Sequence, residues 1–377
     1  MSETSSHVRP PQTWAMLGVH AGDNAQVLAL AKALGWPITV KQIRYDENCP
    51  IDYKDRGASL IGVAATKSDP LTPPWPEAII AIGRRSVPVA RWVKAQSDRQ
   101  ILHVHLGRPR ADLALFDLVV TTPQYDLPDA ANVVKITLPF VSLEAEELAK
   151  AAAEWRERFA ALPRPWTGVM VGGPTTQLQF GVEEARRLVD ELAALLARHD
   201  GSLLVTTSPR TKPDTAAALL TGLKEKMPWR HLFTPFGSSD SNPYKAILAL
   251  SDRFVVSIDS ASMVAETVTR QKPVYVFHLP PKLLSRLARN LQRRRKQRQD
   301  DGQPADPLDK LYDFWIRRGK ATPPRDINLL ENRLIELGVV QPLSDAASEP
   351  SGTFDPISAE TRTALARIQR LWADRAK

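Results

Sequence analysis

The chain has 377 residues, of which 43% are hydrophobic and 24% are charged, a composition typical of a globular protein long enough for two ordinary domains. Its formal net charge of +8 favours an anionic partner, such as nucleic acid, an anionic membrane surface or a phosphorylated substrate. The single cysteine, Cys49, excludes an intrachain disulfide and a cysteine-rich metal site.

The first part of the chain alternates between apolar runs and helical patterns, which predicts a doubly wound α/β domain over residues 12–140. The expected strands are 14–20, 37–44, 77–83, 101–110, 117–122 and 132–137. The expected helices are one that follows the turn at 21–26 and ends at 34, one at 57–65, and one that follows 83–86 and ends at about 96.

The turn after the first strand contains the first candidate catalytic residue. Gly22 allows a tight turn, and Asp23 or Asn24 can cap the helix that follows. An ordinary helix cap would explain Asp23 by itself. Because ligands of doubly wound folds bind at the carboxyl ends of the strands, Asp23 is also our first candidate for a catalytic base.

Two further strand ends in this domain carry polar residues. Gly83, Arg84 and Arg85 could bind a phosphate or an acidic sugar, or could be solvated arginines at a helix start. His103 and His105 alternate along a strand and should face the same side. A catalytic zinc site takes three protein ligands, so we expect no metal here and keep His105 as a second candidate base.

The second part of the chain repeats the α/β pattern. Residues 141–165 read as an interdomain helical linker, and 166–341 as a second α/β domain. Its expected elements include strands 166–171, 202–207 and 230–235 and the helix 182–199. At the end of its first strand, Gly173 and Thr175 belong to a glycine-rich turn that lets the backbone approach a diphosphate closely, although many such turns are only turns.

The most informative stretch runs from Asn242 to Leu279. Asn242 caps a short helix, and the apolar runs 254–258 and 274–279 predict parallel strands buried on both faces. Between these strands lies the turn Asp259-Ser260-Ala261-Ser262-Met263, which opens a helix containing Glu266.

A phosphate fits the start of this helix, because backbone N–H groups, the helix dipole and two hydroxyls can all face it. Glu266 follows Ser262 by four residues, so it lies on the same face about one turn further along. A carboxylate there suits the paired hydroxyls of a ribose. The alternative is a capping box, in which a serine and a glutamate only stabilise the helix start.

Asn242-Pro243-Tyr244, the Asp259–Glu266 turn and Lys272-Pro273 together resemble the plant mitochondrial-fission family called "elongated mitochondria" and its bacterial relatives, which are described as glycosyltransferases. The turn and helix also resemble the nucleotide-sugar site of GT-B enzymes, including UDP-N-acetylglucosamine 2-epimerases. The resemblance covers residues 14 to about 318. It implies a GT-B fold, with two Rossmann-like doubly wound domains facing a cleft.

The resemblance also implies roles for individual residues. Ser260 and Ser262 match diphosphate contacts, and Glu266 matches the ribose-binding carboxylate. In the first domain, Gly22 and Gln26 match a family turn. The remaining residues that we expect at the donor or substrate site are Asn24, Gly83, Arg84, Arg85, Gly173, Thr175, Ser208, Arg210, Phe236, Asn242, Tyr244, Asp259 and Met263.

The end of the chain adds two expectations. Residues 282–298 combine many cations with leucines, so they could contact anionic lipid at a membrane or pack on the domain as a solvated helix. RNA binding is the least favoured reading, because aromatic platforms are missing from this segment. Residues 342–377 should form a flexible segment and a final helix that, as in GT-B folds, packs back on the N-terminal domain.

The resemblance implies an inverting glycosyltransferase that uses a nucleotide-diphosphate sugar. The basic charge and the cations of 282–298 favour a lipid-linked, lipopolysaccharide or other glycolipid acceptor. No Asp-x-Asp motif lies near the donor turns, so we expect neither a metal nor another cofactor. The alternatives are a nucleotide-sugar epimerase and a non-enzymatic interaction protein. With neither a signal peptide nor an apolar run of ~18 residues, we expect a cytoplasmic protein, or one at the inner face of the inner membrane.

Overall fold

A computed structural model describes residues 9–47, 57–238, 241–283, 285–286, 298, 307–318, 325–346, 350 and 355–375. The chain divides into two compact units. Unit 1 contains Met1–Ser142, Gln297–Pro323 and Ile357–Lys377, and unit 2 contains Leu143–Lys296 and Pro324–Pro356. The expected linker therefore belongs to unit 2, and the last helix belongs to unit 1.

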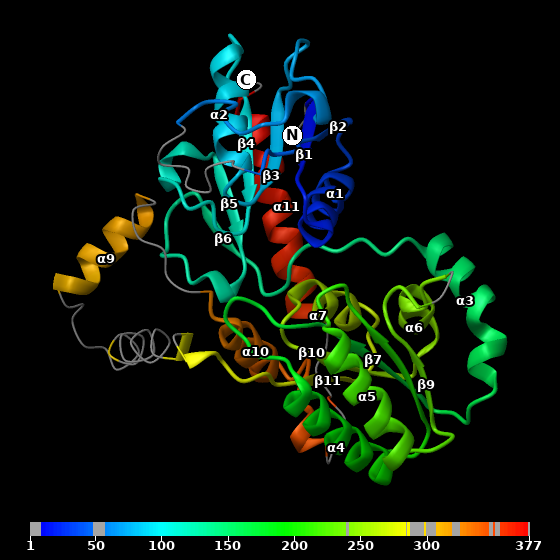
Figure 1. The fold of residues 1–377 in the computed structure, drawn as a ribbon. Helices are drawn as coiled ribbons and strands as arrows, with labels where there is room; N and C mark the ends of the chain where they lie inside the picture. The colour runs from blue at the N-terminus through cyan, green and yellow to red at the C-terminus, as the bar shows by residue number, and fades with distance from the viewer. Residues whose placement is uncertain are drawn as a thin grey trace, which may run out of the picture. The chain divides into compact units, whose positions relative to one another are not determined.

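Unit 1 is built on a six-stranded parallel sheet with the order β2-β1-β3-β4-β5-β6 (Figure 1). Its strands are β1 (Thr13–Leu17), β2 (Ile38–Gln42), β3 (Ala78–Ile82), β4 (Leu102–Leu106), β5 (Leu118–Thr121) and β6 (Val133–Lys135). Its helices are α1 (Ala21–Leu34), α2 (Ser86–Gln96), α9 (Pro307–Arg317) and α11 (Asp355–Arg375).

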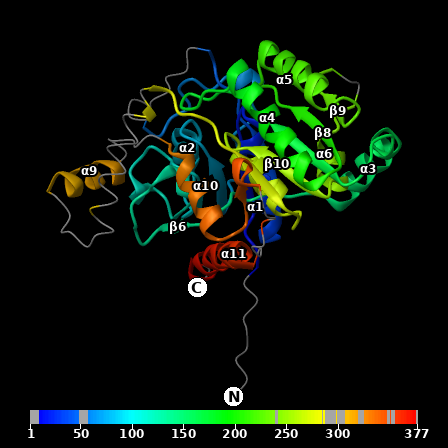
Figure 2. The ribbon, with the colours of Figure 1, turned by 90° about the horizontal axis from the view of Figure 1, so that it is seen from below.

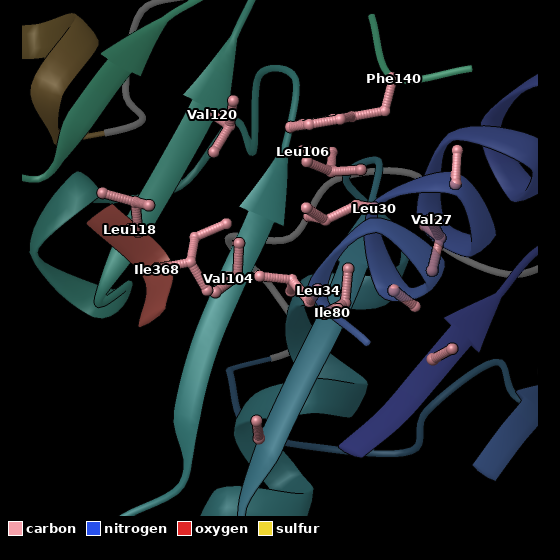
Figure 3. Packing of buried hydrophobic residues seen from close by; sticks show 14 of the residues in the cluster. Val27, Leu30, Leu34, Ile80, Val104, Leu106, Leu118, Val120, Phe140 and Ile368 are labelled. Carbon is pink, nitrogen blue, oxygen red and sulfur yellow. The ribbon is translucent and has the colours of Figure 1, made fainter. Parts of the chain in front are cut away.

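One core of unit 1 lies between α1, the sheet and α11. Val27, Leu30 and Leu34 recur at helical spacing on α1 and pack on sheet residues such as Val104 (Figure 3). Ile368 of α11 joins this cluster from the far end of the chain. α11 is therefore part of the unit 1 core.

Hydrogen bonds also tie α11 to unit 1. The Glu360 carboxylate accepts from the Thr137 backbone N–H at 2.6 Å and from its hydroxyl at 3.1 Å. Trp372 Nε1 donates to the Arg9 carbonyl at 2.7 Å. These contacts join α11 to two segments of unit 1 that lie 223 and 363 residues before it in the sequence.

Unit 2 repeats the architecture with the sheet order β12-β11-β10-β7-β8-β9, again parallel. Its strands are β7 (Trp166–Val171), β8 (Ser202–Thr207), β9 (His231–Thr234), β10 (Arg253–Ser257), β11 (Val274–Phe277) and β12 (Gln341–Pro342). Its helices are α3 (Ala145–Ala160), α4 (Val182–His199), α5 (Pro213–Lys226), α6 (Tyr244–Leu250), α7 (Ala261–Val268) and α10 (Ile327–Glu336). Helices α4 and α5 lie side by side (Figures 1 and 2).

The expected linker helix is α3, and it packs on α6 within unit 2. It buries Leu148, Trp155 and Phe159 at spacings of seven and four residues, which place them on one face. An amphipathic helix with this much apolar surface is stabilised by packing, and for that reason it is part of a domain rather than a connection between domains.

One expected element is absent from the described residues. The helix predicted at 57–65 is wrong, because this segment forms bends and turns and ends at a short 3₁₀ turn, Ala65–Lys67. Gly57 and Gly62 have φ of 54° and 79°, which a right-handed helix cannot accommodate.

The prediction of a GT-B fold class with two Rossmann-like, doubly wound α/β domains is confirmed by the two units. In each sheet the strand order reverses at the first strand of the unit. This strand is β1, between β2 and β3, in unit 1 and β7, between β8 and β10, in unit 2. Such switch points are where open parallel sheets bind ligands, beyond the carboxyl ends of the strands. Among the described helices, none is both long and apolar enough to cross a membrane.

Candidate functional site

Loops from three neighbouring strands of unit 2 meet at its switch point. They follow β7, β8 and β10, and hydrogen bonds join them to one another. The Gly172 N–H donates to the Ser257 hydroxyl at 2.7 Å. The Thr211 hydroxyl donates to the Gly172 carbonyl, which links the β8 loop to the β7 loop. The three strand ends therefore form one bonded cluster.

An ion pair lies at the centre of this cluster. Arg210 Nη2 donates to Asp259 Oδ2 at 2.7 Å, and Arg210 Nη1 donates to the Gly173 carbonyl at 3.2 Å. The Gly173 N–H donates to the same Asp259 oxygen at 3.0 Å. The Asp259 side chain is fully buried, whereas 41% of the Arg210 side chain is exposed. Asp259 therefore positions Arg210, whose exposed part can meet an anion.

Two glycines make this arrangement possible. A Cβ built at Gly172 would lie 2.1 Å from Asp259 Oδ2, and one at Gly173 would lie 2.3 Å from the Arg210 carbonyl oxygen. Both distances are far below van der Waals contact. The glycine pair expected to let a ligand approach the backbone is used here for close packing of the protein's own loops.

Helix α7 begins directly beside this ion pair. Ser260 is its N-cap, and the Ser260 hydroxyl accepts from the Met263 N–H at 3.4 Å. Ser262 lies in the first turn and is half-buried. The positive end of the helix dipole and the Arg210 guanidinium thus lie on neighbouring loops, an arrangement suited to a phosphate.

Glu266 lies further along α7 and is half-buried. The Tyr244 hydroxyl of α6 donates a hydrogen bond to Glu266 Oε2. Burial raises the pKa of Glu266, while the bond from Tyr244 opposes the rise. Burial and the Glu266 charge raise the pKa of Tyr244 well above its usual value. A desolvated carboxylate of this kind binds hydroxyl donors strongly, as the ribose role requires.

The capping-box alternative is wrong for Glu266. The cap is Ser260, so the third helical position is occupied by Met263, and the Glu266 carboxylate bonds across to Tyr244 instead. Asn242 stabilises the start of α6 as expected, because its Oδ1 accepts from the Tyr244 N–H at 3.0 Å, although Pro243 occupies the N-cap position.

The other predicted residues of unit 2 lie on the loops that follow β7, β8 and β9. The Thr175 hydroxyl accepts from the N–H groups of Gln177 and Leu178, so it stabilises its own turn. The Ser208 hydroxyl accepts from the Arg210 N–H at 3.2 Å. Phe236 follows β9, and 53% of its surface is exposed, so its ring is open to a stacking partner.

In unit 1 the helix after β1 starts earlier than expected. His20 is the N-cap of α1, so Gly22 and Asp23 lie in its first turn, and the expected tight turn and cap at Gly22–Asn24 are wrong. Asn24 instead bonds Gly18 twice, accepting from its N–H at 2.7 Å and donating to its carbonyl at 3.1 Å. Asp23 is half-buried at the positive end of the helix.

Four further predicted residues lie in this region of unit 1. Gln26 Nε2 donates to the Gly22 carbonyl at 3.3 Å, within the helix itself. Gly83, Arg84 and Arg85 follow β3, the neighbour of β1, and Gly83 has φ of 78°. The Arg85 guanidinium lies 5.5 Å from the centre of the Tyr45 ring. These residues therefore lie at the switch point of unit 1.

His105 does not fit the role of a catalytic base. His103 and His105 face the same side of β4 as expected, but both are fully buried and pack against Phe116 at 4.9 and 5.1 Å between ring centres. Within the described structure, none of their ring nitrogens has a hydrogen-bond partner. Burial lowers the pKa of His105 to about 3. A base must touch its substrate, and this imidazole is enclosed by the protein.

Two expectations concern other parts of the chain. Most of the basic segment 282–298, and Cys49, lie outside the described residues. In the portion that the structure describes, no group of three or more His, Cys, Asp or Glu side chains could hold a metal ion.

The family of this chain follows from its sequence. A family model described as "Mitochondrial fission ELM1" matches residues 21–310. The chain belongs to this family. A curated relative, the "Mitochondrial fission protein ELM1" of Arabidopsis thaliana, is 30% identical over 224 residues, which are 53% of this chain and 51% of the relative. This ELM1-family chain thus spans about half the length of the relative that it matches.

Solved structures were also compared with this ELM1-family chain. A glycosyltransferase from Rickettsia africae has 11% identity and a TM-score of 0.42, covering 87% of this chain and 98% of its own. The Anabaena protein HepE, in complex with UDP and glucose, has 11% identity and a TM-score of 0.44, covering 86% of this chain and 98% of its own. A UDP-GlcNAc 2-epimerase from Neisseria meningitidis, bound to UDP-GlcNAc, has 10% identity and a TM-score of 0.41. The match covers 86% of this chain and 98% of the epimerase chain.

Sequence reasoning assigned no role to two residues that build the candidate site of this ELM1-family chain. Ser257 and Thr211 hold the Gly172 backbone from either side. Ser257 is the last residue of an otherwise apolar strand, and Thr211 follows the Ser208–Arg210 turn by one residue. A hydroxyl at the end of a buried strand is a usable signal, because a buried polar group needs a partner.

Proposed function

We propose that this chain is an inverting glycosyltransferase whose unit 2 binds a nucleotide-diphosphate sugar. The observation that carries the proposal is Glu266, a desolvated carboxylate with a raised pKa, on the helix that begins beside the exposed face of Arg210. In this proposal the ribose hydroxyls donate to Glu266, and the diphosphate accepts from Arg210 and the start of α7.

The same residues would assist the reaction. A base in unit 1, for which Asp23 is the candidate, removes a proton from an acceptor hydroxyl. The acceptor oxygen then bonds to the anomeric carbon while the bond from that carbon to the diphosphate breaks. The nucleoside diphosphate leaves with additional negative charge, and Arg210 and the α7 dipole stabilise that charge as it develops. We propose that this step needs neither a metal nor another cofactor.

The acceptor in this proposal is a lipid-linked sugar or glycolipid at the inner face of the inner membrane. Support comes from the net charge of +8 and from the cations of residues 282–298. The family name supports a second candidate, a protein that acts by binding partners without catalysis, because the Arabidopsis relative is described as a mitochondrial fission protein.

Calorimetric titration of the full chain with UDP, GDP, CMP and ADP tests the donor site. We expect one nucleotide to bind, and Glu266→Gln to weaken its binding at least tenfold, because each hydrogen bond between a ribose hydroxyl and this half-buried carboxylate contributes about 1.5–3 kcal/mol. Glu191→Gln is the matched control, since burial also raises the pKa of Glu191, which is on α4. If no nucleotide binds, or if both variants weaken binding equally, the proposed donor site is refuted. The non-catalytic role of binding protein partners is then the favoured function.

Sugar transfer is tested separately from binding. Asp23→Asn should bind the nucleotide as tightly as the wild type and should lose transfer to a lipid-linked acceptor. Transfer at the wild-type rate would show that another residue is the base, and transfer that stops when EDTA is added would refute the metal-independent mechanism.

A further inference from the structure

Figures 1 and 2 show helix α9 in orange. Three of its large apolar side chains are exposed to solvent. The exposed fractions of Leu311, Phe314 and Trp315 are 49%, 47% and 36%. These residues recur at spacings of three and four, so they form one stripe along the helix. The Phe314 and Trp315 rings contact edge to face, with centres 5.5 Å apart.

The opposite side of α9 explains why this stripe points outward. Ile316 is 5% exposed and belongs to a core cluster of unit 1 that includes Phe116 and Val119. Asp309 is 8% exposed, so its carboxylate is also turned inward. The helix is therefore held to unit 1 by one face, and that face takes up an acidic side chain.

Cations flank the exposed stripe. Lys310, Arg317 and Arg318 are all exposed. Around the axis of α9, these three cations and the apolar stripe occupy about 160°, because an α-helix has 3.6 residues per turn. Ile316 and Asp309 lie on the opposite side of the helix. The Arg318 guanidinium lies 5.3 Å from the Phe314 ring centre and 3.6 Å from the Asp112 carboxylate, and 56% of its side chain remains exposed.

We propose that α9 is a docking helix for an anionic lipid surface. Leucine and aromatic rings flanked by Lys and Arg, with the Asp309 carboxylate on the far face, are typical of a helix that lies in the headgroup region. A protein partner of neutral surface would not use the cations, whereas an anionic bilayer uses the cations and the rings together. The proposal deepens the proposed function by placing unit 1 at the membrane, and it rests on that function only for the location of the acceptor.

Co-sedimentation of the full chain with phosphatidylcholine vesicles, with and without phosphatidylglycerol, tests the proposal. We expect binding that requires phosphatidylglycerol and weakens with salt. Phe314→Ser/Trp315→Ser should lower the partition coefficient at least tenfold, because it removes most of the inserted apolar area. Lys310→Ala and Arg317→Ala should each lower it about fivefold. Trp229→Ser, which changes an 86% exposed tryptophan of unit 2, and Lys224→Ala are the matched controls and should leave it unchanged.

Nucleotide binding in each variant shows that the chain is folded and separates this proposal from the donor site. Loss of vesicle binding with unchanged nucleotide binding supports α9 as the docking helix, even if sugar transfer is never found. The proposal is overturned if vesicle binding of the wild type does not increase when phosphatidylglycerol is present. It also fails if binding survives Phe314→Ser/Trp315→Ser but is lost when the arginines at 293–295 are replaced by alanine. If light scattering shows that the wild type is a dimer and that Phe314→Ser/Trp315→Ser is a monomer, this face is a protein interface instead.

Discussion

Replacing Gly172 by alanine would test whether close packing of loops organises the candidate site. The new Cβ would lie 2.1 Å from one oxygen of Asp259 and 2.4 Å from the other. The Asp259 side chain is fully buried, so it can move only by leaving its partners. These partners are Arg210 at 2.7 Å and the Gly173 N–H at 3.0 Å.

The expected cost has two parts. Overpacking a well-packed position costs about 1–3 kcal/mol. Losing hydrogen bonds to a charged group costs about 1.5–3 kcal/mol each. Because 41% of the Arg210 side chain is exposed, water can replace part of what the guanidinium loses. We therefore expect Gly172→Ala to lower the free energy of unfolding of unit 2 by about 3 kcal/mol.

Native-state hydrogen exchange is the suitable assay, because the two units need not unfold as one. Peptides from β7 and β10 report on unit 2, and peptides from β1 report on unit 1. Gly18→Ala is the matched control, since no atom lies within 4 Å of its Cβ position. Gly18→Ala should change the free energy of unfolding measured by hydrogen exchange by less than about 0.5 kcal/mol.

A double-mutant cycle with Asp259→Ala identifies the cause. If the clash with the carboxylate is responsible, Gly172→Ala should cost at least about 1 kcal/mol less when Asp259 is already alanine. An equal cost in both backgrounds would refute the steric reasoning, as would a cost below about 1 kcal/mol in the wild-type background.

Three more outcomes follow from the structure. His105 has a lowered pKa of about 3, so its contribution to stability is present above the unfolded pKa of about 6.5 and is lost as the pH falls through this window. Between pH 7 and pH 4, His105 should account for about 3 kcal/mol of the unfolding free energy that unit 1 loses, and His105→Leu should abolish this part of the loss. Hydrogen exchange at both pH values measures it, and an unchanged dependence of stability on pH in the variant would contradict this. Tyr244→Phe should raise the nucleotide Kd about fivefold in calorimetry, because Glu266 loses the donor that orients it, and an unchanged Kd would exclude this positioning role. Glu360→Gln should destabilise unit 1 by about 1–2 kcal/mol through its bonds to Thr137 and should leave exchange in unit 2 unchanged; equal losses in both units would contradict the assignment of α11 to unit 1.

Local patterns determined most of the elements. The runs 166–171 and 202–207 were predicted as strands and match β7 and β8, because continuous apolar segments of this length suit strands buried on both faces. The helix predicted at 182–199 matches α4, whose apolar residues follow the helical period. The alternation of such elements was sufficient to predict two doubly wound α/β domains.

The helix predicted at 57–65 shows where local patterns fail. The composition allows a helix, but two glycines adopt positive φ there, and a glycine's backbone angle is decided by the surrounding chain. Helix α3 shows the same limit at the domain level. Its sequence is amphipathic, but only the structure shows that its apolar face packs on α6.

The sequence by itself determined where the candidate site lies, because the turn Asp259–Met263 and Glu266 are close in the chain and share one strand–helix junction. Only the tertiary structure decided what each side chain does. Asp259 meets Arg210 across 49 residues, and Glu266 meets Tyr244 across 22. His105 was a candidate base until its surroundings were known, and α11 joins the unit 1 core from the end of the chain. The physical reason is that backbone periodicity is local, whereas burial, ion pairing and pKa depend on neighbours that the folded chain brings together.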